Sequence, residues 1–95
     1  MGRTKAAPTS SDRDLIVVYW DGFGREHQAA EQKDSETPLQ WEFTQEEAET
    51  QCQRQIKKGA LRAEVWRPGK TPEKVAAFER TRSGACQRTY PRRFS

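Results

Sequence analysis

The chain has 95 residues, of which 33% are hydrophobic and 33% are charged, and its formal net charge is +3. This length supports one small hydrophobic core and excludes a second, because a domain of about 60 residues buries only about 60% of its unfolded surface. No apolar run approaches the roughly 20 residues of a membrane-spanning helix, and the polar N-terminus is not typical of a secretory signal. The two cysteines, Cys52 and Cys86, form neither a disulfide framework nor a CxxC pair, so we expect reduced thiols and a cytoplasmic protein.

The charges and the apolar residues divide the chain into three parts. Residues 1–13 are polar and include a Thr-Ser-Ser run, which predicts a disordered N-terminal tail. Residues 14–80 hold the apolar residues that can form a core, from Leu15 to Phe78, and are predicted to be a single domain. Residues 81–95 lack both periodicity and acidic side chains, which predicts a basic C-terminal tail.

Two strands and a hairpin are predicted in the first half of the domain. The continuous apolar run in DLIVVYW, residues 14–20, predicts a central strand that is covered on both faces for part of its length. Asp21-Gly22 is typical of a type I′ hairpin turn, with Gly24 as a second permissive position. Residues 25–36 have no strand periodicity and are predicted to extend the hairpin briefly at most and then to form a mobile loop. In residues 38–43 Leu39, Trp41 and Phe43 alternate with polar residues, which predicts a second strand, antiparallel to the first, with these three side chains in the core.

Residues 44–59 show the clearest element, a helix with signals at both ends. Thr44 and Glu47 have the spacing of a capping box, and Gly59 stands where a left-handed residue often ends a helix. The apolar stripe of this helix is narrow and consists of Ala48, Cys52 and Ile56.

A strand is predicted after the helix, because Leu61, Ala63 and Val65 alternate with Arg62, Glu64 and Trp66. A Pro-Gly turn follows at residues 68 and 69. Residues 72–80 begin like a helix but alternate like an edge strand, and we favour the strand. The predicted fold class is therefore α+β, a single β-β-α-β-β domain whose antiparallel or mixed sheet carries one helix on one face.

The sequence contains no recognisable catalytic or metal-binding constellation. The chain has one histidine, His27, whose neighbour Glu26 points to the opposite side of an extended chain, so we interpret His27 as a surface residue. One histidine and two cysteines lack the paired spacing of a zinc site. Cys86 lies near Arg82 and Arg88, a basic setting that would activate its thiol, although an exposed bystander is the simpler interpretation. We predict that the chain is not an enzyme and uses no cofactor or metal.

The aromatic and basic residues indicate a binding function instead. An exposed tryptophan beside an arginine on an uncovered sheet face is a good anchor for a protein partner. The predicted protein-binding residues are Trp66, Arg62, Arg67 and Trp20 on the sheet and Arg54, Lys57 and Lys58 on the helix. The alternative for Trp66 is that it packs under residues 25–36 or under the C-terminal tail. We expect no membrane contact, and a monomer or a weak homodimer that pairs through a sheet edge at residues 75–80.

The alternative function is nucleic-acid binding, in which basic residues contact phosphates and exposed aromatic rings stack on bases. The predicted residues are Arg80, Arg82, Arg88, Arg92 and Arg93. The acidic residues of the domain weaken this alternative, since Glu42 and the glutamates of the first helical turn would repel a phosphate backbone.

Two resemblances correspond to these two candidate functions, one to nucleic-acid binding and one to protein binding. The order of an aromatic strand, a glycine-rich turn, a strand and the segment FTQEEAETQCQRQIKKG resembles a WGR domain, a module associated with nucleic acid and with repair enzymes. The Trp, Gly and Arg of that family are contiguous, whereas Trp20, Gly24 and Arg25 are separated here, so the chain is not assigned to it. In size and charge the chain is also similar to small proteins of phages and mobile elements, including anti-CRISPR inhibitors. That similarity implies an inhibitor that covers a surface of a large host complex.

Overall fold

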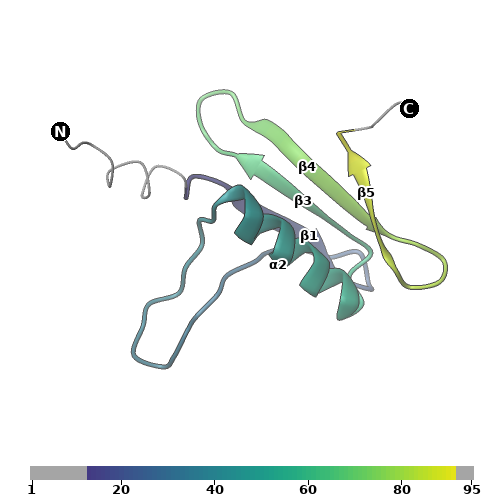
Figure 1. Ribbon diagram of the computed structural model, residues 1–95, viewed down its shortest axis with the longest axis horizontal. Helices are drawn as coiled ribbons and strands as arrows, with labels where there is room; N and C mark the ends of the chain where they lie inside the picture. The colour runs from purple at the N-terminus through teal and green to yellow at the C-terminus, as the bar shows by residue number, and fades with distance from the viewer. Residues whose placement is uncertain (1–12, 92–95) are drawn as a thin grey trace.

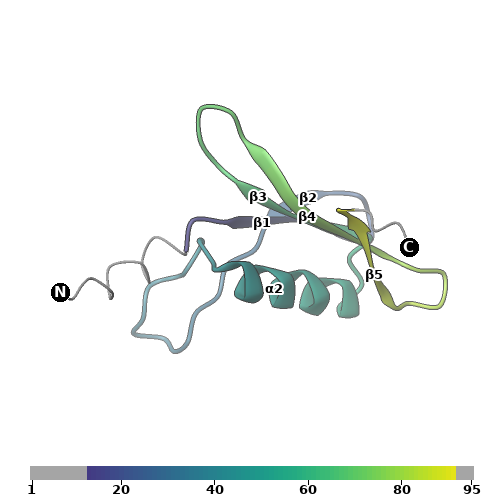
Figure 2. The same cartoon turned by 45° about the horizontal axis from the view of Figure 1, so that its top comes forward.

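The computed structural model describes residues 13–91, which form a five-stranded antiparallel sheet with helix α2 across one face (Figure 1; Figure 2). The strand order is β2-β1-β3-β4-β5. The elements are β1 (Ile16–Trp20), β2 (Glu26–Gln28), α2 (Gln45–Lys57), β3 (Arg62–Arg67), β4 (Glu73–Arg80) and β5 (Cys86–Tyr90). The predicted α+β class and its β-β-α-β-β arrangement are confirmed, and β5 adds a further strand. No helix within residues 13–91 is long and apolar enough to span a membrane.

The hydrophobic core lies between α2 and the sheet. Alternate residues of β1, β3 and β4 face the helix, as the period of two in a strand requires. The narrow helical stripe of Ala48, Cys52 and Ile56 is fully buried against them, as predicted. The sheet side of the core consists of Leu15, Val17, Ala63, Val65, Ala76 and Phe78.

The ends of α2 match the predicted caps. The Oγ1 of Thr44 accepts a hydrogen bond from the backbone N–H of Glu47 at 3.2 Å, and the Glu47 side chain accepts one from the Thr44 N–H at 3.0 Å. At the other end Gly59 has a φ of +116°. The N–H groups of Gly59 and Ala60 donate to the carbonyls of Ile56 and Gln55, the pattern of a Schellman motif.

The second strand was predicted wrongly. Residues 26–28, where the sequence allowed only a brief extension of the hairpin, form β2 beside β1. Residues 38–43 form no strand and pair with the rest of the chain through two isolated bridges, Leu15–Phe43 and Glu31–Gln40. The tight turn before β2 explains the difference, because the chain returns at once and takes the free edge of β1. Of the three predicted core residues only Phe43 is buried, while Leu39 and Trp41 are 50% and 40% exposed.

The turns at both ends of the sheet have the same construction. The Asp21 carbonyl accepts from Gly24 N–H, the Asp21 N–H donates to the Arg25 carbonyl, and Gly24 has a φ of +81°. The hairpin is confirmed, but its left-handed residue is Gly24, so the turn is not the predicted type I′ turn at positions 21 and 22. The same bonds recur among Thr81, Gly84 and Ala85, where Gly84 has a φ of +92°.

The second of these turns corrects the predicted C-terminal boundary. Because it returns the chain along β4, residues 86–90 form β5 and belong to the sheet rather than to a tail. Strand β4, the favoured interpretation of residues 72–80, therefore lies between β3 and β5 and offers no free edge at 75–80. The predicted tail residues 1–12 and 92–95 lie outside the described residues.

Candidate functional site: a groove on the open face of the sheet

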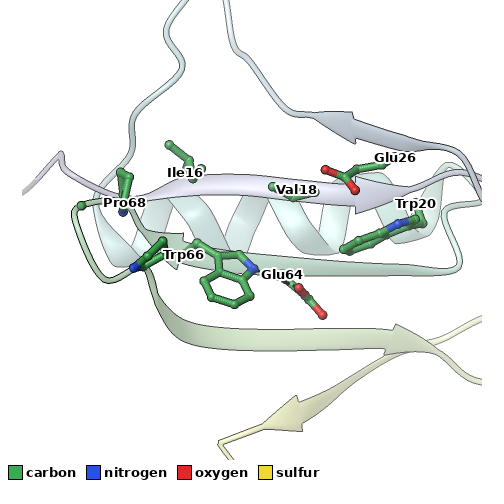
Figure 3. A pocket seen from close by; sticks show the side chains of 9 residues that line it. Ile16, Val18, Trp20, Glu26, Glu64, Trp66 and Pro68 are labelled. Atoms are coloured by element: carbon green, nitrogen blue, oxygen red, sulfur yellow. Dashed lines mark hydrogen bonds between the residues drawn. The ribbon is translucent and has the colours of Figure 1, made fainter.

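The face of the sheet opposite α2 carries a groove of about 390 Å³ (Figure 3). Strands β1, β2 and β3 and the turn after β3 supply its walls. The residues that line it are Ile16, Val18, Trp20, Glu26, Glu64, Trp66, Pro68, Gly69 and Pro72. The first six come from alternate strand positions, so the pattern that builds the core on one face also builds the groove on the other.

The strand register places the two tryptophans at opposite ends of the groove. Ile16 pairs with Trp66, and Trp20 lies four residues further along β1, a distance of about 13 Å along the strand. Val18 lies between the two rings and Ile16 lies beside Trp66, and together they form the apolar floor of the groove (Figure 3). All four side chains are half-buried, because residues 13–91 form no second layer over this face.

The ring of Trp66 is held by polar contacts. Its indole Nε1–H donates a hydrogen bond to Glu64 Oε1 at 2.9 Å. The other carboxylate oxygen of Glu64 lies 3.6 Å from Lys74 Nζ, and this ammonium is 5.7 Å from the centre of the Trp66 ring. These contacts satisfy the indole N–H and restrict the motion of the ring. A ring that is already ordered loses less conformational entropy when a partner binds.

The ring of Trp20 is supported by an arginine. The guanidinium carbon of Arg62 lies 4.2 Å from the ring centre, a stacked cation–π geometry. Strand pairing places Arg62 on one side of Trp20 and Glu26 on the other. None of the ion pairs between described residues includes Arg62 or Glu26, so both charges are free to meet a partner.

The predicted protein-binding residues do not form one surface. Trp66 and Arg62 lie on the open face, as predicted, and Trp20, whose face the sequence pattern left undecided, lies there with them. Arg67 does not line the groove, and its guanidinium contacts the carboxylates of Asp14 and Glu73, each at 3.3 Å. The three basic residues at the C-terminal end of α2 lie on the other side of the sheet (Figure 2). They are Arg54, Lys57 and the C-cap residue Lys58.

Sequence reasoning missed several residues of the groove. Ile16 and Val18 were ambiguous because both faces of β1 are apolar, so periodicity could not assign them. Glu26 was not identified as a site residue because residues 25–36 were expected to extend the hairpin only briefly before forming a loop. The signal that identifies β2 is Asp21 followed by Gly24, a turn that returns the chain beside β1.

The predicted nucleic-acid residues are also dispersed. Arg80 and Arg82 are exposed at the β4–β5 turn. Arg88 is already paired, since its Nη2 lies 2.8 Å from Glu49 Oε1 and its guanidinium stacks 4.9 Å from the Phe78 ring. Arg92 and Arg93 lie outside the described residues.

His27 has a partner that its sequence neighbours did not reveal. Its Nε2 lies 2.8 Å from Asp21 Oδ2, and its ring stacks on Tyr19 at 5.2 Å between centroids. The contact with His27 and a hydrogen bond from the Arg25 N–H lower the pKa of Asp21 to about 2. Because the Asp21 carboxylate also bonds the backbone of the turn, the pair stabilises the β1–β2 hairpin.

The cysteines are not activated by their surroundings. Burial raises the pKa of Cys52 to about 12. Burial also raises the pKa of Cys86 and outweighs the opposing effect of Arg88, which does not favour the reactive thiolate, the less favoured of the two sequence interpretations.

Comparisons with protein-family models, with curated proteins and with solved structures gave no match to this chain. Within residues 13–91 no group of three or more His, Cys, Asp and Glu side chains is placed to hold a metal ion. The open-face groove, with its two fixed aromatic rings, is therefore the strongest candidate site in the described part of the chain.

Proposed function

We propose that this chain is a non-catalytic binding protein that docks onto a partner protein through the open face of its sheet. The observation that carries the proposal is the groove between Trp20 and Trp66, two half-buried rings held in place on a sheet face that the described part of the chain leaves without a second layer. Tryptophan and arginine dominate the binding energy of protein interfaces. A fixed ring also loses little conformational entropy when a partner covers it.

This mode of action suits an inhibitor that covers a surface of a larger complex, as anti-CRISPR-type proteins of phages do. We place the protein in the cytoplasm as a monomer or weak homodimer, with both cysteines as free thiols, the state in which they occur in the structure.

Nucleic-acid binding is the second candidate. It is favoured by the exposed Arg80 and Arg82 at the β4–β5 turn, together with the arginines that follow β5. The groove itself does not favour it, because the charged side chains that line it, Glu26 and Glu64, would repel phosphates. Deleting residues 81–95 would remove β5 as well as the arginines, so Arg80→Gln with Arg82→Gln is the cleaner variant.

The test is capture of a partner from native cell extract with the intact chain as bait. We expect a partner that resists nuclease treatment and whose capture falls about tenfold or more with Trp20→Ala or Trp66→Ala. Trp41→Ala is the matched control, because Trp41 is 40% exposed and lies outside the groove. Thermal unfolding of each variant confirms that the fold persists.

Retained capture by both folded groove variants would contradict protein docking at this face. Capture that disappears with nuclease, and with the Arg80 and Arg82 variant, would establish the second candidate in its place.

A further inference from the structure

The charges in the groove indicate what chemistry its partner carries. Among residues 13–91 the charged side chains that line it are the two carboxylates of Glu26 and Glu64. Glu64 is compensated, since it accepts the Trp66 N–H and lies 3.6 Å from Lys74 Nζ. Glu26 is exposed and belongs to none of the ion pairs between described residues. The lining of the groove therefore keeps one uncompensated negative charge, while the nearby Arg62, which also belongs to none of those ion pairs, stacks on Trp20 and is not a lining residue.

That charge stands beside an apolar surface. Figure 3 shows the Glu26 carboxylate next to Val18, at the edge of the floor that Val18 forms with Ile16. A long apolar stem with a positive head matches both parts of this site, because lysine and arginine bury their methylene groups while the charge stays near solvent.

The aromatic ends of the groove also favour a cation. The protein already places Arg62 at 4.2 Å over Trp20 and Lys74 at 5.7 Å from Trp66. A cation is attracted to the negative face of an indole ring. The surfaces of the Trp20 and Trp66 rings that line the groove would attract a cation supplied by a partner in the same way.

We propose that the groove receives a lysine or arginine side chain from an extended segment of the partner protein, with its stem on Ile16 and Val18 and its charge at Glu26. This inference rests on the proposed function and specifies the partner's chemistry. An acidic or phosphorylated segment is disfavoured by the same carboxylate.

Nuclear magnetic resonance can test the inference with defined probes. The full chain has three tryptophans, so the indole N–H signals of Trp20 and Trp66 report on the groove and that of Trp41 serves as an internal reference. The probes are acetylated, amidated pentapeptides, glycine-alanine-X-alanine-glycine, in which X is lysine, arginine, norleucine or glutamate. We expect the lysine and arginine peptides to shift the two groove signals with millimolar affinity, about three- to fivefold more tightly than norleucine, and the glutamate peptide to bind most weakly.

The variant Glu26→Gln should abolish the advantage of the cationic peptides over norleucine. The matched control is Glu79→Gln, since Glu79 is exposed on β4 opposite Arg62 but does not line the groove. Equal affinity for lysine and norleucine, no effect of Glu26→Gln, or no shift with any peptide at about 10 mM would each overturn the cation proposal. The docking proposal is decided separately by partner capture with the tryptophan variants, so the two failures are distinguishable.

Discussion

The hydrogen bond from Trp66 to Glu64 is predicted to fix one wall of the groove, and a double-mutant cycle can measure it. Trp66→Phe removes the N–H donor but keeps an aromatic ring, and Glu64→Ala removes the acceptor. The N–O distance is 2.9 Å, and the Glu64 side chain is 14% exposed. Hydrogen bonds to charged groups contribute about 1.5–3 kcal/mol when well shielded, so a coupling energy of about 1–2 kcal/mol is expected at this partly exposed site.

The measurement is urea unfolding of the four proteins in the cycle, followed by circular dichroism. Each single variant should lower the unfolding midpoint without changing the slope, because the surface exposed on unfolding stays nearly the same. Lys74→Ala is the control for the neighbouring ion pair and should cost only about 0.2–1 kcal/mol. A coupling energy near zero would refute the argument that Glu64 holds the Trp66 ring.

Three further predictions concern the elements that position the groove. Thr44→Ala should lower the free energy of unfolding by about 1 kcal/mol, measured by urea unfolding, because it removes the N-cap of α2. Gly84→Ala should cost about 1–2 kcal/mol in the same assay through its φ of +92° alone, since nothing lies within 4 Å of the added Cβ, whereas Gly22→Ala, which has no positive φ, should cost much less. Asp21 has a pKa lowered to about 2, so its carboxylate stabilises the fold above about pH 4 and loses this effect as the pH falls toward 2. Asp21→Asn should therefore unfold more easily than the wild type at pH 7 and resemble it near pH 2; an equal difference at both pH values would contradict the assigned cause.

The parts of the fold that the sequence predicts are those with local signals. The capping box and the glycine at the end of α2 use contacts within a few residues, so they are readable from the chain. The alternation in β3 assigned Val65 to the core and Trp66 to the open face correctly. Strand β2 was anticipated only as a brief extension of the hairpin, and β5 was missed. Both follow the same turn, in which an acceptor side chain is followed by a glycine three residues later, and this turn was not recognised at Thr81 and Gly84.

Which residues belong to the site depends on the pairing of β1 with its two neighbours, β2 and β3. Alternation assigned Arg62 and Trp66 to the open face but left the face of Trp20 undecided. The arrangement of the three residues around a groove requires the register of β1 against β3. Glu26 joins them only because the turn at Asp21 brings β2 alongside. The basic residues of α2 were grouped with the sheet residues by charge alone, and the thickness of the core separates the two groups.

Site-specific photocrosslinking in native extract tests the central claim most directly. A benzoylphenylalanine replaces Gln28, an exposed residue whose register partner Val18 forms part of the groove floor, or Lys57 on α2 at the opposite side of the sheet. Docking through the open face predicts a crosslinked partner protein from position 28 and none from position 57. Crosslinking from position 57 alone, or equally from both, would contradict it.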